Sequence, residues 1–191
     1  MTRVVKKILR IIIIIVVSFA ALFGGVLGTY VIVNRQEVIE PFEIGDRDSQ
    51  NKILLASQGS KFKEKLVTEF VLALKNDSTY ISVIDCTQLT DEFLENWNAI
   101  IMIHTMQIHK IPEEAEIFLH KVPDLSKVLL VSTSGAGDEH YKKLDIDAVS
   151  SASRMAAINP ILKWALPKLE QVLHKQTRAF SGVDEEMLSN R

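Results

Sequence analysis

The longest apolar stretch of the chain lies near its amino terminus. No charged residue occurs between Arg10 and Arg35, and residues 11–33 are rich in isoleucine, valine and other apolar types. Because the hydrocarbon core of a bilayer is about 30 Å thick and a helix rises about 1.5 Å per residue, one helix of this length can cross it. We therefore expect a transmembrane helix over residues 11–34, after a basic segment over residues 1–10.

The end of this stretch favours a retained membrane anchor over the alternative, a cleaved signal peptide. Signal peptides have apolar regions of about 7 to 15 residues, which a site of small residues follows. Here the stretch is longer and ends in the sequence GTYVIV. Basic residues precede it and acidic residues dominate after it, so the positive-inside rule predicts a cytoplasmic amino terminus and an extracytoplasmic domain. The reverse orientation, with the domain in the cytoplasm, is the alternative.

The next segment, residues 35–51, is acidic and contains Pro41 and Gly45 without a sustained apolar period. These features are typical of a linker. From Lys52 onward, short apolar runs alternate with amphipathic segments, which predicts one domain over residues 52–175 and a flexible tail over residues 176–191.

The apolar runs have the length and composition of buried strands, and the amphipathic segments have helical spacing. The expected strands are 53–56, 80–85, 99–103, 128–131 and a weaker 144–149. The expected helices are 62–74, with Lys63, Glu64, Lys65 and Glu69 on the polar face, 90–95, a segment that begins at Pro112, and a final segment that begins at Asn159. Pro167 should kink or divide the last helix. Strands that alternate with helices imply right-handed crossovers and a parallel sheet with helices on both sides.

Composition excludes several classes of function. The net charge of −2 argues against nucleic-acid binding, which needs a concentrated basic surface. Cys86 is the only cysteine, so an intramolecular disulfide and a cysteine-rich zinc site are excluded. We expect Cys86 to pack as a small apolar residue, and we expect no metal site, because other metal ligands do not cluster in the sequence.

The order of the elements, the size of the domain and the turn after the first strand resemble the flavodoxin-like fold over residues 52–175. The resemblance implies an α/β three-layer sandwich with a parallel sheet of strand order 2-1-3-4-5. Ligands of such sheets bind beyond the carboxyl ends of the strands, at the point where the strand order reverses. The rule selects three loops: 57–61, 104–110 and 132–141.

The first loop is the expected phosphate site. Flavodoxins hold the phosphate of FMN with a turn of the form T-x-T-G-x-T, and here Ser57, Gly59, Ser60 and Lys61 stand at this turn. Backbone amides and the positive end of the following helix attract anions. Lys61 replaces an outer threonine of the motif. In the alternative interpretation the segment only turns the chain and Ser60 caps the helix.

The third loop is rich in hydroxyl groups and glycine. Its likeness to flavodoxins implies that Thr133, Ser134, Gly135 and Gly137 contact the edge of the flavin ring. The second loop, which contains His104 and His109, lacks the aromatic residue that stacks on the flavin in flavodoxins. No residue is assigned a catalytic role, and adjacent charged residues such as Asp138 do not establish an acid–base pair.

Two functions follow from these expectations. In the first, the resemblance implies a membrane-anchored domain that binds FMN and transfers electrons, or reduces a small acceptor such as a quinone, with a redox partner beside the lipid bilayer. In the alternative, the domain lacks a cofactor and is a binding or assembly module tethered to the membrane, because fold alone does not fix function.

Overall fold

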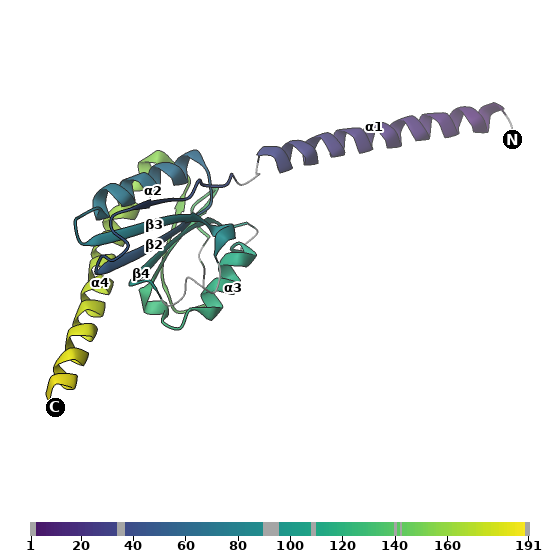
Figure 1. Cartoon of the computed structure of the whole chain (residues 1–191). Coiled ribbons are helices and arrows are strands. Elements are labelled where there is room, and N and C mark those ends of the chain that lie inside the picture. Colours follow the sequence, from purple (N-terminus) through teal and green to yellow (C-terminus); the bar gives the residue numbers. More distant parts are fainter. Residues whose placement is uncertain are drawn as a thin grey trace. The chain divides into compact units, whose positions relative to one another are not determined.

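The computed structural model (Figure 1) describes residues 3–33, 37–89, 96–107, 110–139, 141 and 143–189. The expected helix over residues 90–95 lies outside them, as do His109 and His140. The chain divides into two compact units, Met1–Gln36 and Glu37–Arg191.

The described residues of the first unit form one long helix, α1 (Arg3–Val33). Its segment Arg10–Thr29 is long and apolar enough to cross a membrane. Isoleucine, valine, leucine and phenylalanine side chains of this segment are exposed in the isolated chain. The hydroxyl of Thr29 donates a hydrogen bond of 2.8 Å to the carbonyl of Gly25 one turn earlier, which satisfies this polar group inside the helix.

The second unit is built on a six-stranded sheet of order β1-β3-β2-β4-β5-β6. All neighbouring strands are parallel except β1, which pairs antiparallel with β3. The five parallel strands have the order 2-1-3-4-5, so the predicted flavodoxin-like fold is confirmed. The strands are β1 (Phe42–Ile44), β2 (Asn51–Ser57), β3 (Thr79–Asp85), β4 (Ala99–Thr105), β5 (Val128–Ser134) and β6 (Asp147–Ala152).

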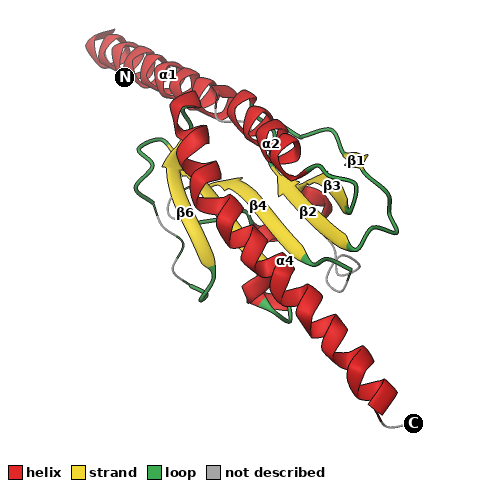
Figure 2. Ribbon diagram, turned by 90° about the vertical axis from the view of Figure 1, so that its left-hand side faces the viewer, coloured by secondary structure: helices red, strands yellow, loops and turns green. Residues whose placement is uncertain are grey.

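Helices cover both faces of the sheet. The helices α2 (Lys61–Leu74) and α4 (Ile158–Ser189) lie across one face, as Figure 2 shows, and α3 (Glu113–Lys121) packs on the other. Successive residues of a strand point to opposite faces. Ile101 of β4 therefore joins the core under α2 and α4, whereas Ile100 joins the core under α3. This double burial explains why β2, β4 and β5 contain continuous apolar runs, whereas β6 is more polar and less buried.

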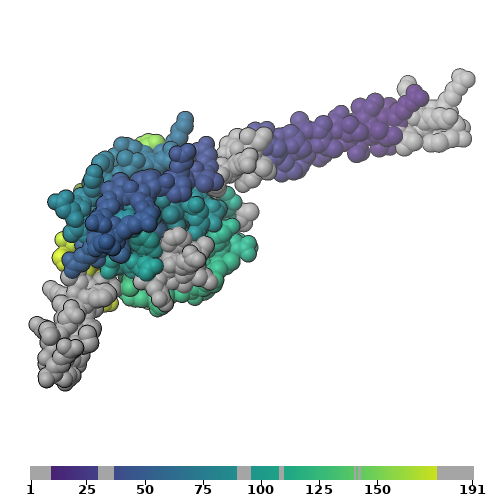
Figure 3. All heavy atoms as spheres, viewed as in Figure 1, coloured from purple at the N-terminus to yellow at the C-terminus, as the bar shows by residue number. Residues whose placement is uncertain are grey.

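The segment that we expected to be a linker instead belongs to the domain. Ile39 is only 5% exposed and packs in the core under α2 and α4. In β1, Phe42 pairs with Val83 of β3. The dark blue residues at the start of the domain lie over the face of the domain seen in Figure 3. The compact unit begins at Glu37, before the expected start at residue 52. One buried side chain and a strand of three residues are too short a pattern to predict from the sequence.

The carboxyl-terminal elements also differ in detail from the prediction. The last strand, β6, begins at Asp147 rather than at residue 144, and the described residues between β5 and β6 contain no helix. Pro167 does not divide α4, which continues as helix to Ser189. The flexibility of residues 176–191 stays a prediction.

Candidate functional site

Buried polar residues gather at the carboxyl ends of the parallel strands, where the fold places ligands. Ser57 ends β2, Asp85 ends β3 and Thr133 lies next to the end of β5, and all three are at most 2% exposed. They point to the face of α2 and α4, because they alternate with residues of the α3 core. His104 and Ser132 occupy the opposite face by the same alternation.

The expected phosphate turn is covered by the chain's own backbone. The segment Glu37–Ile39, here called the strap, runs antiparallel beside Gly59. The amide of Gly59 donates a hydrogen bond of 2.6 Å to the carbonyl oxygen of Glu37. A β-carbon at Gly59 would lie 2.4 Å from the carbonyl carbon and oxygen of Glu37. The glycine therefore permits the strap to approach, and the turn does not fit an FMN phosphate at this amide while the strap is in place.

The other residues of the turn have local structural roles. Ser60 is the N-cap of α2, and its hydroxyl oxygen accepts a hydrogen bond of 3.2 Å from the amide of Lys63. The buried hydroxyl of Ser57 donates to the carbonyl of Gln58 at 2.9 Å. Lys61 is exposed. This geometry is that of the alternative interpretation, in which the segment turns the chain and caps the helix.

Gln58 links the carboxyl ends of β2 and β4, the neighbouring strands at which the strand order reverses. Its amide donates to the carbonyl of Ile103 at 3.1 Å, and its side-chain oxygen accepts from the amide of Thr105 at 2.7 Å. The same oxygen lies 3.5 Å from the ammonium nitrogen of Lys63. Hydrogen bonds within the chain therefore connect the end of β2 to the end of β4 at the place where a ligand of this fold would bind. Sequence reasoning missed Gln58, because a glutamine in a polar turn carries no distinctive signal.

Asp85, at the end of β3, forms a second hydrogen-bonded contact with the strap. One carboxylate oxygen accepts a hydrogen bond of 3.0 Å from the amide of Ile39. The other oxygen accepts from the amide and the hydroxyl of Thr87, at 2.9 and 2.6 Å. The carboxylate thus links the strap to the end of β3 and to the short helix Cys86–Gln88 that follows.

Lys63 and Cys86 place two ionisable groups in the interior near this edge. Lys63 is 2% exposed, although the sequence places it on the polar face of its helix. Burial lowers the pKa of Lys63 to about 8, against the opposite effects of Cys86 and Asp85. Burial raises the pKa of the Cys86 thiol to about 12, so at neutral pH the group is a thiol and not a reactive thiolate.

The expected ring-edge residues are mostly engaged within the fold. The hydroxyl of Thr133 donates to the carbonyl of His104 at 3.1 Å, and the hydroxyl of Ser134 accepts from the amide of Gly137 at 2.8 Å. Gly137 has φ of +81° and packs so closely on β6 that a β-carbon would lie 2.3 Å from the amide nitrogen of Ala152. Only Gly135, of the four, is exposed with open space around its α-carbon.

His104 is completely buried, a property that its position in an expected loop did not reveal. Its Nε2 lies 3.0 Å from the hydroxyl of Ser132, while Nδ1 makes no hydrogen bond among the described residues. Burial lowers the pKa of His104 to about 4, so the ring is neutral at pH 7. Within the part of the chain that the structure describes, no group of three histidine, cysteine or acidic residues is arranged to hold a metal ion.

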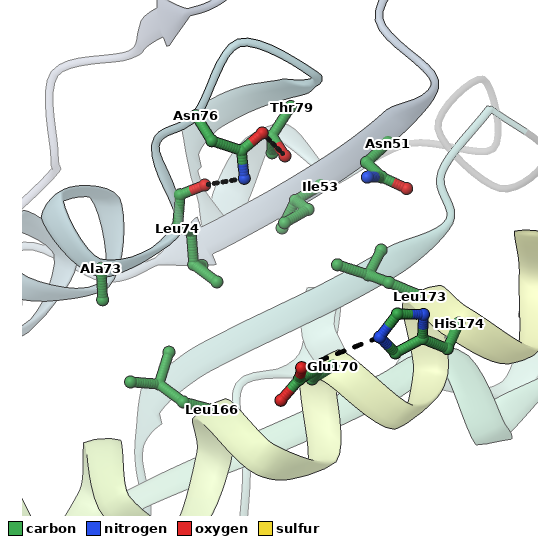
Figure 4. Close-up of a pocket in the computed structure, with 10 residues that line it drawn as sticks. All are labelled: Asn51, Ile53, Ala73, Leu74, Asn76, Thr79, Leu166, Glu170, Leu173 and His174. Atoms are coloured by element: carbon green, nitrogen blue, oxygen red, sulfur yellow. Dashed lines mark hydrogen bonds and ion pairs between the residues drawn. The ribbon is translucent and has the colours of Figure 1, made fainter.

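A pocket lies at the other edge of the sheet, beside the amino ends of β2 and β3. It has a volume of about 510 Å³ and opens between α2 and α4 (Figure 4). No residue of this pocket was predicted as a site residue, because its walls come from segments distant in sequence. The lining residues are Asn51, Ile53, Ala73, Leu74, Asn76, Thr79, Leu166, Glu170, Leu173 and His174.

No protein-family model matches the sequence, and no curated protein sequence matches it. Solved structures that are similar include an azoreductase from Bacillus anthracis, with a TM-score of 0.41 and 8% identity over 65% of this chain and 98% of that protein. A flavodoxin from the domain Archaea has a TM-score of 0.44 and 11% identity over 63% and 98% of the two chains. A flavodoxin from Streptococcus pneumonia TIGR4 has a TM-score of 0.41 and 18% identity over 63% and 97%.

Proposed function

We propose that the protein is a membrane-tethered binding module with a flavodoxin-like fold that holds no flavin at the carboxyl edge of its sheet. The observation that carries the proposal is the strap, whose Glu37 carbonyl accepts the hydrogen bond of the Gly59 amide. In a flavin-binding turn this amide would face the phosphate. Here the chain supplies its own acceptor at that position.

Displacement of the strap would be unfavourable in free energy. Ile39 would leave the core, and burial of a side chain of this size contributes roughly 1.5–3 kcal/mol. The carboxylate of Asp85 would also lose the hydrogen bond that it accepts from the amide of Ile39. A phosphate group would have to compensate for both losses before it gained affinity, and this supports a domain that works without FMN.

The tether in this proposal is α1, whose apolar segment Arg10–Thr29 is long enough to span a bilayer. We propose that the basic residues before it stay in the cytoplasm and that the domain lies on the extracytoplasmic side. The anchor would concentrate the binding module at the membrane surface, where a ligand or an assembly partner meets it.

A second candidate is an FMN-dependent electron carrier that reduces a partner or a small acceptor such as a quinone. One observation favours it: Thr105 ends β4 at the carboxyl edge and is only partly buried, and a hydroxyl at this edge can form a hydrogen bond with a flavin ring. FMN would supply the redox chemistry, and the residues of this chain would bind and orient it.

The experiment that separates the two candidates is a flavin-binding assay on the full chain in detergent micelles. The protein is incubated with FMN, freed of excess flavin and examined by absorbance near about 450 nm, with a known flavodoxin treated in parallel. We expect the flavodoxin to retain flavin and this protein to retain none. Stoichiometric flavin on the wild-type chain would overturn the proposed function and establish the second candidate.

A further inference from the structure

We propose that the pocket between α2 and α4, here called the α2/α4 pocket, binds a small cationic amphiphile that has an amine head and an aromatic or aliphatic body. The inference rests on the proposed binding function and names the site and the ligand class for it. The pocket lies at the amino ends of β2 and β3, at the opposite edge from the strap.

The interior of the α2/α4 pocket suits an apolar body. Ile53 of β2, which is fully buried, forms the floor, and Leu74 of α2 and Leu166 and Leu173 of α4 form the walls. In Figure 4 these side chains point toward one another from the two helices and the strand. Pockets for small ligands have volumes of about 300–1,000 Å³ and are mostly apolar with a few polar groups, and the volume of about 510 Å³ falls in this range.

The mouth of the pocket favours a positive charge. The carboxylate of Glu170 lies there, and its Oε1 is 3.7 Å from Nε2 of His174, a residue that is uncharged unless it is protonated. The carboxyl end of α2 also lies at the pocket, and the carbonyl end of a helix carries a partial negative charge. Lys75 and Lys175 adjoin lining residues in the sequence, but neither lines the pocket.

Two asparagines at the mouth differ in what they offer a ligand. The side chain of Asn76 is occupied, because its oxygen accepts hydrogen bonds from Ser78 and Thr79 and its nitrogen donates to the carbonyl of Leu74. The side-chain amide of Asn51 makes no hydrogen bond among the described residues. Its oxygen can therefore accept a hydrogen bond from an ammonium group beside the carboxylate of Glu170.

The test compares two probes that share an indole ring and differ in the charge of the side chain, tryptamine and indole-3-propionate. Binding to the full chain in lipid nanodiscs is measured by isothermal titration calorimetry, and the heat from empty nanodiscs is subtracted. We expect tryptamine to bind with a Kd below about 1 mM, as its size allows, and at least about fivefold more tightly than the propionate. Equal or tighter binding of the propionate would overturn the ligand class.

Variants locate the site. Ala73→Trp fills the pocket from α2 and should abolish tryptamine binding, whereas Leu72→Trp places the same side chain next to it, at a position that is 64% exposed and does not line the pocket, and should leave the Kd unchanged. Glu170→Gln should weaken binding about threefold to fivefold. Unaltered binding by Ala73→Trp would overturn the location.

The two proposals can fail separately. Retention of FMN in the flavin assay would contradict the flavin-free function and leave the calorimetric result standing. Absence of tryptamine binding by a chain that retains no FMN would overturn the α2/α4 pocket as this site while the proposed function stands.

Discussion

Gly59 lies against the backbone of the strap, and the absence of a side chain at this position leaves room for that approach. Ala at this position would place its β-carbon against the backbone of Glu37 and Val38. Overpacking of this kind costs on the order of 1–3 kcal/mol. We therefore expect Gly59→Ala to lower the free energy of unfolding by this amount, measured by urea denaturation of the chain in micelles.

Gly135 supplies the matched control for this substitution. A β-carbon there meets no atom within 4 Å, so Gly135→Ala should change the free energy of unfolding by less than about 0.5 kcal/mol. If the two variants were equally stable, the close approach of the strap to Gly59 would be wrong.

His104 makes the stability of the domain depend on pH. Its pKa is about 4 in the folded protein and about 6.5 when unfolded, so the unfolded chain binds the extra proton between these values. Stability should be fully present above pH 6.5 and fall as the pH decreases toward 4, by at most about 3 kcal/mol. Urea denaturation between pH 5 and pH 7 measures the slope.

A variant comparison isolates this contribution from that of the carboxylates. His104→Gln keeps a polar partner for Ser132 but does not titrate, and should flatten the slope. A slope in His104→Gln equal to that of the wild-type chain would show that His104 is not the group that titrates.

At the scale of elements, the strap is a part of the domain core. Ile39→Ala removes a side chain that is 5% exposed, and such truncations cost about 2–5 kcal/mol. Val38 precedes it in the sequence and is 67% exposed, so Val38→Ala should have almost no effect. Thermal unfolding of both variants measures the difference, and equal midpoints would indicate a strap that does not contribute to the core.

Elements with a long apolar or helical pattern could be predicted from the sequence. The strands β2, β4 and β5 contain continuous apolar runs because both of their faces are buried, so their order with the helices predicts the sheet. The strap could not be predicted, since Ile39 is a single apolar residue in a polar segment. Hydrogen bonds between distant segments, such as that from Thr105 to Gln58, leave no periodic trace. The burial of Lys63 is likewise a tertiary effect that overrides the polar pattern of its helix.

For the whole molecule, α1 should determine where the protein resides. We expect the full chain to remain in the membrane fraction after extraction with alkaline carbonate, because its apolar segment prefers the hydrocarbon core. A chain that begins at Glu37 is the matched control and should be released into the supernatant. Release of the full chain would contradict the anchor.

The place of α4 in the sequence affects how the protein can be made. Ile161, Ala165 and Leu169 close the core under α2 and α4, and they follow every strand of the sheet in the chain. On the ribosome, this apolar face therefore remains open until residues near 169 have been synthesised. Apolar surface that is exposed at this stage favours aggregation, so we expect fragments that end before α4 to be poorly soluble.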